Sequence, residues 1–578
     1  MKWKLDDILK ENEFDGLYKE IEKDGEELKK WVKKLSPKMS QDSFKKLLLF
    51  EEEIGIKMAR LSYLPHLMEA VNQKNKKAKI MKSRAEDLGL NISGEGVKIG
   101  LWIQGKRKPF LDDENAKRLF SVIDDLEYSL TRSRKGAKYS LEEREEEIIR
   151  HKDASGTEVL DELREMISTE FSYKIGKKKI KSQAELLALV YSPKRELREA
   201  AYKALLNKQK ENIDKFFAIY QGIVKDWAYE AKLRGYKNSI EVRNWGNDIP
   251  NKAVESLLSV CSDNRKVFWQ YFDWKAKELG LKKLKRSDIY APLMKIDKNY
   301  SFEQAKKLVL DAFGEFSENF YNGAQKIIND EHIDVNPGEN KRSGAFCATV
   351  EPKISPYIML NFTGKSRDLS TLAHELGHGV HSLLANKHLA SVQQANLPLA
   401  ETASTLAELV LFEKMLSIEK NKKIKKAWLA EKMADAYATI CRQNYFVKFE
   451  IEAHKRMAEG LNSEKLSMMY LKNLREQFGN SVEIEPIFAY EWSYISHIFE
   501  SPFYCYAYNF GELLSYSLFM KYKQDKSFLK KIEKLLSTGG SKNPVELLKG
   551  AGVKIEEKEF WQKGFDVVKN WQKELERL

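Results

Sequence analysis

The segment from Thr371 to His381 constrains this chain most, because it contains the pattern HELGH, with His374, Glu375 and His378. On an α-helix each residue advances about 100°, so two histidines four positions apart lie on one face. Both imidazoles can then reach one metal ion, and Glu375 can reach a water beside it. Neutral imidazole is a good zinc ligand, and hydrolysis needs a carboxylate next to the water. The pattern alone also fits a helix with two surface or capping histidines.

The flanking residues predict that this helix runs from Asp368 to about Ala385. Asp368 is the expected N-cap, an apolar face repeats at helical spacing, and no proline interrupts it. His381 comes one turn after His378. We expect it either to support the metal ligands as part of the same polar cluster or to be buried and hydrogen-bonded on its own.

Two short strands, Gly344–Val350 and Tyr357–Phe362, are predicted directly before this helix from their β-branched and aromatic residues. A strand edge beside a metal helix can pair with an extended peptide through backbone hydrogen bonds. Gly344, Ala345 and Phe346 are therefore candidate substrate-binding residues. A hairpin that only braces the helix is an equally good interpretation.

A catalytic zinc site with three protein ligands needs one more ligand besides the two histidines. The metzincin spacing would place a histidine at 384, where the sequence has leucine, so that class is excluded. Glu401 follows His378 by 23 residues and opens an Ala-rich helix, so it is the candidate. His388 is a rival in the presumed turn. Glu408, seven residues after Glu401, faces the same way as a supporting partner for a ligand histidine or as an ordinary buried acid.

The composition fits one large helical body: 578 residues are 42% hydrophobic, and 13 prolines and 30 glycines leave little for linkers. Helices are predicted from Phe14 to Leu35 and from Gln41 to Leu61, whereas the Gly-rich stretch Asn91–Phe110 is expected to be a loop or a short strand. No window is apolar enough to span a membrane, and the first residues lack the apolar run of a signal peptide. The four cysteines show no CxxC spacing, so we expect reduced thiols in a cytoplasmic protein.

The net charge of +13 does not indicate nucleic-acid binding, because the basic residues are interleaved with 86 acidic ones and no nucleic-acid motif accompanies them. The denser lysine runs are short and read as solvated faces. We therefore expect neither nucleic acid nor a membrane as a partner.

Five blocks together resemble the thimet oligopeptidase and oligoendopeptidase F family of zinc metallopeptidases. The blocks resemble the oligoendopeptidase F branch most closely, and weaker similarity extends over most of the chain. They run in that branch's order: Lys341–Phe346, Pro356–Asn361, Thr371–His381, Ala400–Thr405 and His497–Tyr508.

The resemblance implies a mainly α, two-lobed body with a deep central channel and a small β-sheet next to the HELGH helix. We expect an N-terminal helical lobe over residues 1–190 and the metallopeptidase domain over residues 191–578. It also implies one zinc per chain, with His374, His378 and Glu401 as ligands and Glu375 as the base.

In the last block, the resemblance implies that His497 and tyrosines stabilise the oxyanion of the scissile carbonyl. Ser501 and Pro502 read as the N-cap and first residue of a helix, which places Tyr504 and Tyr508 on one face and Tyr506 on the other. Tyr508 and Tyr504 are therefore the predicted catalytic tyrosines.

The function implied is hydrolysis of internal bonds in short peptides, with folded proteins excluded by the channel. A carboxypeptidase or dipeptidyl carboxypeptidase of the same fold, or a peptide-binding protein without turnover, is the alternative. An exopeptidase usually fixes the substrate's terminal carboxylate with a basic residue, and the sequence singles out no Lys or Arg for that role.

Overall fold

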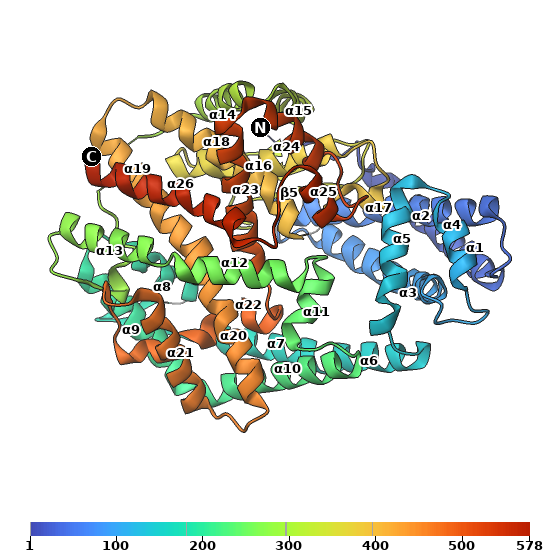
Figure 1. Cartoon of the computed structure of the whole chain (residues 1–578), viewed down its shortest axis with the longest axis horizontal. Helices are drawn as coiled ribbons and strands as arrows, with labels where there is room; N and C mark the ends of the chain where they lie inside the picture. The colour runs from blue at the N-terminus through green and yellow to red at the C-terminus, as the bar shows by residue number, and fades with distance from the viewer. Residues whose placement is uncertain (1, 181, 295–297, 396) are drawn as a thin grey trace. The chain divides into compact units, whose positions relative to one another are not determined.

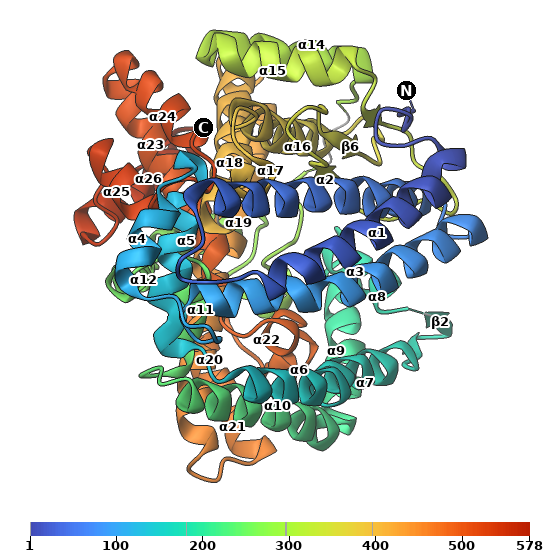
Figure 2. The same ribbon diagram turned by 90° about the vertical axis from the view of Figure 1, so that its right-hand side faces the viewer.

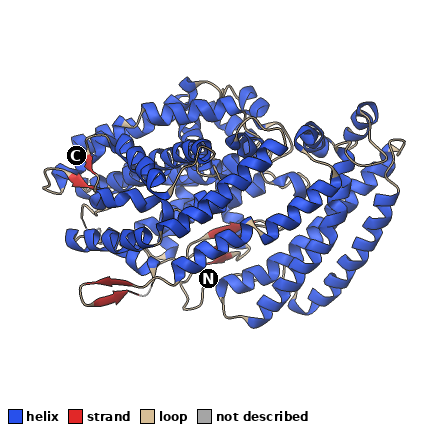
Figure 3. Cartoon of the chain, turned by 90° about the horizontal axis from the view of Figure 1, so that it is seen from below, coloured by secondary structure: helices blue, strands red, loops and turns tan. Residues whose placement is uncertain are grey.

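The computed structural model describes residues 2–180, 182–294, 298–395 and 397–578, and helices make up most of it (Figure 3). The strands are short and form one three-stranded and two two-stranded sheets among the described residues. The prediction of a mainly α fold with a small sheet is confirmed. Among the helices searched in the described residues, none combines the length and apolar character needed to cross a bilayer.

Two compact units divide the chain, and each is assembled from three separate segments. Unit 1 contains Met1–Glu146, Lys298–Ser417 and Lys521–Val553, and unit 2 contains Glu147–Asp297, Ile418–Met520 and Lys554–Leu578. The chain therefore passes back and forth between the units. The expected division at residue 190, and the channel, stay predictions.

Unit 1 begins with three long helices that pack against one another: α1 (Phe14–Lys33), α2 (Gln41–Val71) and α3 (Lys76–Ile103) (Figure 2). Leu61, Leu64 and Leu67 of α2 lie in one apolar core with Tyr357 and Met359 of the small sheet. The N-terminal helices thus pack against the buried side chains of the small sheet. Two further helices follow: α4 (Asp113–Phe120) and α5 (Asp124–Gly136).

The Gly-rich stretch Asn91–Phe110 is helical as far as Ile103, so the expectation of a loop or short strand is wrong for that part; residues 104–110 form the expected loop. The physical reason is packing: Ile99, Trp102 and Ile103 are buried in a core with α1, α2 and α5. The gain from burying them outweighs the cost of about 1 kcal/mol for each helical glycine.

The second segment of unit 1 contains the predicted hairpin and the helices around it. Strands β4 (Ile333–Asp334), β6 (Tyr357–Met359) and β5 (Phe346–Ala348) lie in that order, with β4 parallel and β5 antiparallel to β6. Phe346 pairs with Met359, and Ala348 with Tyr357. The predicted hairpin is confirmed, and β5 is one of the two edge strands of this sheet.

Helices α14 (Phe302–Phe316) and α15 (Glu318–Asn329) pack on α16 (Ser366–Leu384), which also contacts β5 and β6 (Figure 1). The remaining helices of unit 1 are α17 (Ala390–Gln393), α18 (Leu397–Ile418), α24 (Leu529–Leu536) and α25 (Pro544–Gly550).

Unit 2 is helical apart from β1 (Tyr173–Ile175), β2 (Lys178–Ile180), β3 (Leu284–Lys285) and β7 (Val482–Glu483). Its centre is filled by aromatic side chains, among them the fully buried Tyr220 and Trp492. The helices used below are α10 (Ile213–Leu233), α11 (Ser239–Gly246), a π-helix (Tyr437–Arg442), α20 (Gln443–Met457), α22 (His497–Glu500) and α23 (Tyr506–Gln524).

Candidate metal centre

Helix α16 begins two residues before the predicted start, with Lys365 at the N-cap. Asp368 lies three positions further on, and its carboxylate accepts hydrogen bonds from the backbone N–H groups of Thr363 at 2.7 Å and Lys365 at 3.1 Å. The predicted N-cap role of Asp368 is therefore wrong. The residue still satisfies free N–H groups of the helix start, but from inside the first turn. The predicted end at Ala385 is confirmed.

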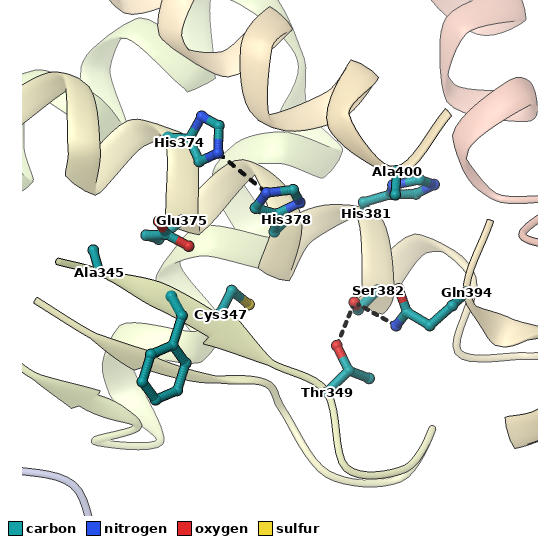
Figure 4. A pocket seen from close by; sticks show the side chains of 11 residues that line it. Ala345, Cys347, Thr349, His374, Glu375, His378, His381, Ser382, Gln394 and Ala400 are labelled. Carbon is teal, nitrogen blue, oxygen red and sulfur yellow. Dashed lines mark hydrogen bonds between the residues drawn. The ribbon is translucent and has the colours of Figure 1, made fainter. Parts of the chain in front are cut away.

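The two histidines of the HELGH pattern point the same way from α16. The Nε2 atoms of His374 and His378 lie 3.2 Å apart, and the two rings are nearly perpendicular. This is the outcome of a four-residue spacing on a regular helix. Figure 4 shows both rings, with Glu375 beside them on the same helix.

Glu401 comes from α18 and completes a group of three possible metal ligands. Its Oε2 atom lies 3.7 Å from the Nε2 atoms of both His374 and His378. Zinc binds such atoms at about 2.0–2.2 Å in a tetrahedron, which puts neighbouring ligand atoms roughly 3.3–3.6 Å apart. The three separations therefore fit one zinc ion.

The close approach of α18 to α16 depends on Gly377. A Cβ atom at this position would lie 2.7 Å from Cα of Ser404 and 2.9 Å from the carbonyl oxygen of Ala403. Only glycine lets the backbone of α18 come this near. The glycine inside the HELGH pattern thus helps to bring Glu401 to the histidines.

Each ligand histidine also has a partner that orients its ring. The Nδ1 atom of His374 donates to Glu408 at 2.6 Å, and Glu408 accepts a second hydrogen bond from Ser370 at 3.2 Å. Burial lowers the pKa of His374, but the hydrogen bond to Glu408 outweighs it and raises the pKa to about 9. His378 hydrogen-bonds to the backbone of Ala400. Such partners leave the other ring nitrogen for a metal.

His381 is buried and hydrogen-bonded to the backbone of Ala400 and Leu536. Burial lowers its pKa to about 4, so the ring is neutral at pH 7. His381 therefore shares the Ala400 backbone group with His378. It lies in the polar cluster and is also buried and hydrogen-bonded, so the two interpretations left open by the sequence both describe it.

Glu375 is buried, with 7% of its surface exposed. Burial raises the pKa of its carboxyl group to about 7, and the negative charges of Glu401 and Glu408 add to this, against the charge of His374. A carboxylate with a pKa near neutrality both accepts and returns a proton readily.

A pocket of about 300 Å³ opens beside these residues (Figure 4). Glu375 and the ligand histidines lie at one side of it, and Thr349, Ser382 and Gln394 lie at the other. Ser382 hydrogen-bonds to Thr349 at 2.6 Å and to Gln394 at 3.1 Å. Sequence reasoning missed this polar group. Only the alternation along the strand, from Ala345 to Cys347 and Thr349, signals that these residues share a face.

The candidate substrate-binding residues lie at the start of strand β5. Ala345 and Phe346 line the pocket, and Gly344 precedes them with a positive φ of 82°. The carbonyl oxygen of Gly344 accepts a hydrogen bond from the Asn361 side chain at 2.8 Å. The edge strand β5 and the two histidines of the candidate metal centre thus border one cavity.

His388, the rival ligand, is held elsewhere in unit 1. Its Nδ1 atom lies 2.8 Å from Asp125, and its Nε2 atom lies 2.9 Å from the carbonyl oxygen of Ser537. Both ring nitrogens are used in these contacts. Within the described residues, the three-residue metal group does not include it.

The last predicted block lies in unit 2, where His497, Tyr504 and Tyr508 form a group. The Nε2 atom of His497 lies 3.1 Å from the hydroxyl of Tyr508, and the rings of Tyr504 and Tyr508 are 5.2 Å apart. Tyr506 points away, is fully buried, and accepts a hydrogen bond from Asn247 at 2.8 Å. The sequence predicted this division of the three tyrosines.

The predicted helix start at Ser501 and Pro502 is wrong, because α23 begins at Tyr506 and residues 501–505 form turns. Three contacts stabilise these turns. Arg243 of α11 donates to the carbonyl of Pro502 at 3.0 Å and to the hydroxyl of Ser501 at 2.8 Å. Glu450 of α20 accepts from the backbone N–H of Phe503, whose φ of 59° is unusual for a large side chain. These contacts compete with helix formation at the residues where the sequence predicted it.

Several known proteins are similar to this chain in sequence and in fold. The family model described as Peptidase family M3 matches residues 188–567. An oligoendopeptidase F homolog of Borreliella burgdorferi is 27% identical over 100% of this chain and 98% of its own length. An oligoendopeptidase F homolog of Lactococcus lactis is 28% identical over 68% of this chain, and the match spans 65% of that relative's length.

The crystal structure of oligoendopeptidase-F from Enterococcus faecium has the same fold, with a TM-score of 0.73, 21% identity and 98% coverage of both chains. The family model covers well over half of the chain. These findings confirm the resemblance based on the five sequence blocks. The chain belongs to peptidase family M3, in its oligoendopeptidase F branch.

Proposed function

We propose that this protein is a zinc-dependent endopeptidase that hydrolyses internal bonds of short peptides. The observation that carries the proposal is the group of His374, His378 and Glu401, with buried Glu375 beside the two histidines in one pocket. When bound to these three residues, zinc would supply a Lewis acid that polarises a peptide carbonyl and lowers the pKa of water.

Glu375 is the proposed base. Its carboxylate accepts the proton of the attacking water and passes it to the nitrogen of the leaving amine. Glu408 holds the His374 ring through Nδ1, which leaves Nε2 free to hold a metal when one is bound. Glu375 and the His374 ring border the same pocket, whereas Glu408 acts through its hydrogen bond to that ring.

Substrate binding is assigned to the edge strand β5. Backbone groups of Ala345 and Phe346 pair with an extended peptide, which needs no particular side-chain sequence. The polar group of Thr349, Ser382 and Gln394 would contact a substrate side chain in the pocket.

His497 and Tyr508 are proposed to donate hydrogen bonds to the oxyanion, each contributing about 3 kcal/mol to transition-state stabilisation. This assignment rests on the family resemblance of the segment His497–Tyr508. Location in the cytoplasm and the lack of a nucleic-acid partner stay predictions from the sequence.

The test is digestion of a mixed peptide library by the intact protein, with the products identified by mass spectrometry. We expect cleavage at internal bonds, loss of cleavage with a chelator, and recovery after zinc is added back. A compact folded protein in the same mixture should remain intact. Removal of only one or two residues from the C-terminus would make the protein an exopeptidase, and chelator-resistant cleavage would contradict a metal mechanism.

A further inference from the structure

The pocket beside the candidate metal centre lies wholly within unit 1, and α16 provides one row of its lining (Figure 4). His374, His378 and Ser382 are four residues apart, so they follow one another along a single face of the helix. With a rise of about 1.5 Å per residue, Ser382 lies about 6 Å further along the helix axis than His378. The row therefore leads from the candidate metal ligands to a hydroxyl group at the other side of the pocket.

A second row comes from the chain around β5. Side chains alternate between the two faces of a strand, and Ala345, Cys347 and Thr349 line the pocket from this side. Thr349 and the buried Ser382 share a hydrogen bond of 2.6 Å, and Gln394 donates to Ser382 from Nε2 at 3.1 Å (Figure 4). We call Thr349, Ser382 and Gln394 the polar end of the pocket.

The polar end has hydrogen-bonding capacity that its own contacts do not use. One of the two hydroxyl groups donates its proton to the other, so the second hydroxyl proton stays free. Within the described residues, the Oε1 atom of Gln394 accepts no hydrogen bond, because the side chain is held through Nε2. The polar end therefore offers a ligand one donor and one acceptor. Turning the Gln394 amide by 180° exchanges these roles and keeps one of each.

The polar end also carries no formal charge. Its three side chains are neutral, and burial raises the pKa of the neighbouring Cys347 thiol well above its usual range, so that it stays protonated. In the described residues, no lysine, arginine or aspartate lines the pocket. A charged side chain at the polar end would lose its water without gaining a partner of opposite charge, which is costly. An apolar side chain would leave the free donor and the free acceptor without partners.

We propose that the polar end is a subsite for the carboxamide side chain of a substrate glutamine or asparagine next to the cleaved bond. A carboxamide has one acceptor oxygen and two N–H donors, which match the free groups of the polar end. An extended glutamine side chain spans roughly 5 Å from Cα to its amide, close to the roughly 6 Å between His378 and Ser382 along α16. Glutamine is therefore the preferred residue. The inference rests on the proposed peptidase function and deepens it, because it names the side chain that is selected.

The test measures equilibrium binding of matched peptides to the zinc-loaded Glu375→Gln protein, which leaves the peptides uncleaved. One glutamine is moved along a short peptide, and each peptide is compared with the same peptide carrying methionine or glutamate at that position. Methionine has a similar length and no amide, and glutamate has a charge in place of the amide. We expect glutamine at one position to bind about 10- to 100-fold more tightly than either, as for two neutral hydrogen bonds.

Three variants in the same background connect this preference to the polar end. Thr349→Val removes one hydroxyl and keeps the shape of the side chain, so the preference for glutamine should fall about five- to tenfold. Gln394→Lys adds a cation at an exposed position and should move the preference from glutamine to glutamate. The matched control is Thr371→Val, which removes a hydroxyl from α16 that bonds to the Arg367 carbonyl and does not line the pocket. It should leave the preference unchanged.

The proposal is overturned if methionine or glutamate binds as tightly as glutamine at every position. It is also overturned if the preference for glutamine survives unchanged in both Thr349→Val and Gln394→Lys. Cleavage of the same peptides by the unmodified protein tests the peptidase function separately. A preference for glutamine in binding without any cleavage would support the subsite and contradict the proposed function.

Discussion

The candidate metal centre in unit 1 and the His497–Tyr508 segment in unit 2 are built in different ways. His374, Glu375 and His378 lie on one regular helix, and their arrangement follows from a four-residue spacing. His497, Tyr504 and Tyr508 are brought together by turns with an unusual φ at Phe503, stabilised by side chains more than 50 residues away in sequence. The first arrangement follows from residues close together in sequence, whereas the second depends on contacts between residues far apart in sequence. The predictions below test this difference.

The largest expected effect separates the base from a metal ligand in unit 1. Glu375→Gln should reduce hydrolysis by about 10³- to 10⁴-fold and keep zinc, because an amide cannot accept the proton of water. Glu401→Ala should lose zinc, measured by atomic emission on the purified protein. If Glu375→Gln loses zinc while Glu401→Ala retains it, the assignment of the third ligand is wrong.

Next comes the hydroxyl of Tyr508 in unit 2. Tyr508→Phe removes one donor and keeps the ring, so kcat should fall by about 10²- to 10³-fold with zinc content unchanged. Tyr506→Phe is the matched control, since Tyr506 contacts Asn247 and points away from His497. The control should lose about 1 kcal/mol of stability and little kcat. If Tyr508→Phe kept its kcat while Tyr506→Phe lost it, the proposed roles of the two tyrosines would be reversed.

Gly377→Ala tests whether the metal centre depends only on the histidine spacing within α16 or also on the close packing of α18 against it. The added Cβ would meet the backbone of α18 at Ser404 and Ala403, so we expect a loss of about 1–3 kcal/mol in the free energy of unfolding and weaker zinc binding. Gly379→Ala on the same helix is the control, because the one close contact of its Cβ is with the flexible end of the Ile327 side chain rather than with backbone. Thermal unfolding and zinc titration measure both. Equal stability and equal zinc binding in the two variants would show that α16 and α18 can move apart without loss.

The smallest expected effect concerns the turn that Arg243 stabilises. Arg243→Met removes the hydrogen bonds to Pro502 and Ser501, so His497 and Tyr508 should be less well positioned and kcat should fall about tenfold. KM and zinc content should stay unchanged, and Arg243→Lys should restore part of kcat. Arg234→Met is the control, because Arg234 bonds to Glu230 near the end of its own helix. A change in KM alone would assign Arg243 to substrate binding.

Two errors in the sequence predictions fall where distant contacts decide the local structure. The stretch Asn91–Ile103 is helical despite its glycines, because Ile99 and Trp102 are buried against other helices. The start of α23 lies four residues after Pro502, because Arg243 and Glu450 hold the preceding turn. The Asp368 carboxylate accepts hydrogen bonds from backbone N–H groups at the helix start, as expected of a cap, but it does so from inside the first turn. In the first two cases a contact with residues far away in the sequence decides the local structure, whereas the contacts of Asp368 are local.

The sequence by itself determined the helical class, the hairpin before the HELGH helix, and the family, because these follow from periodicity and from short blocks of residues. It also determined that His374 and His378 share a face, since helical spacing alone requires it. Only the tertiary structure decided that Glu401 rather than His388 joins them. Asp125 and Ser537 hold the His388 ring elsewhere, and Gly377 allows α18 to approach α16.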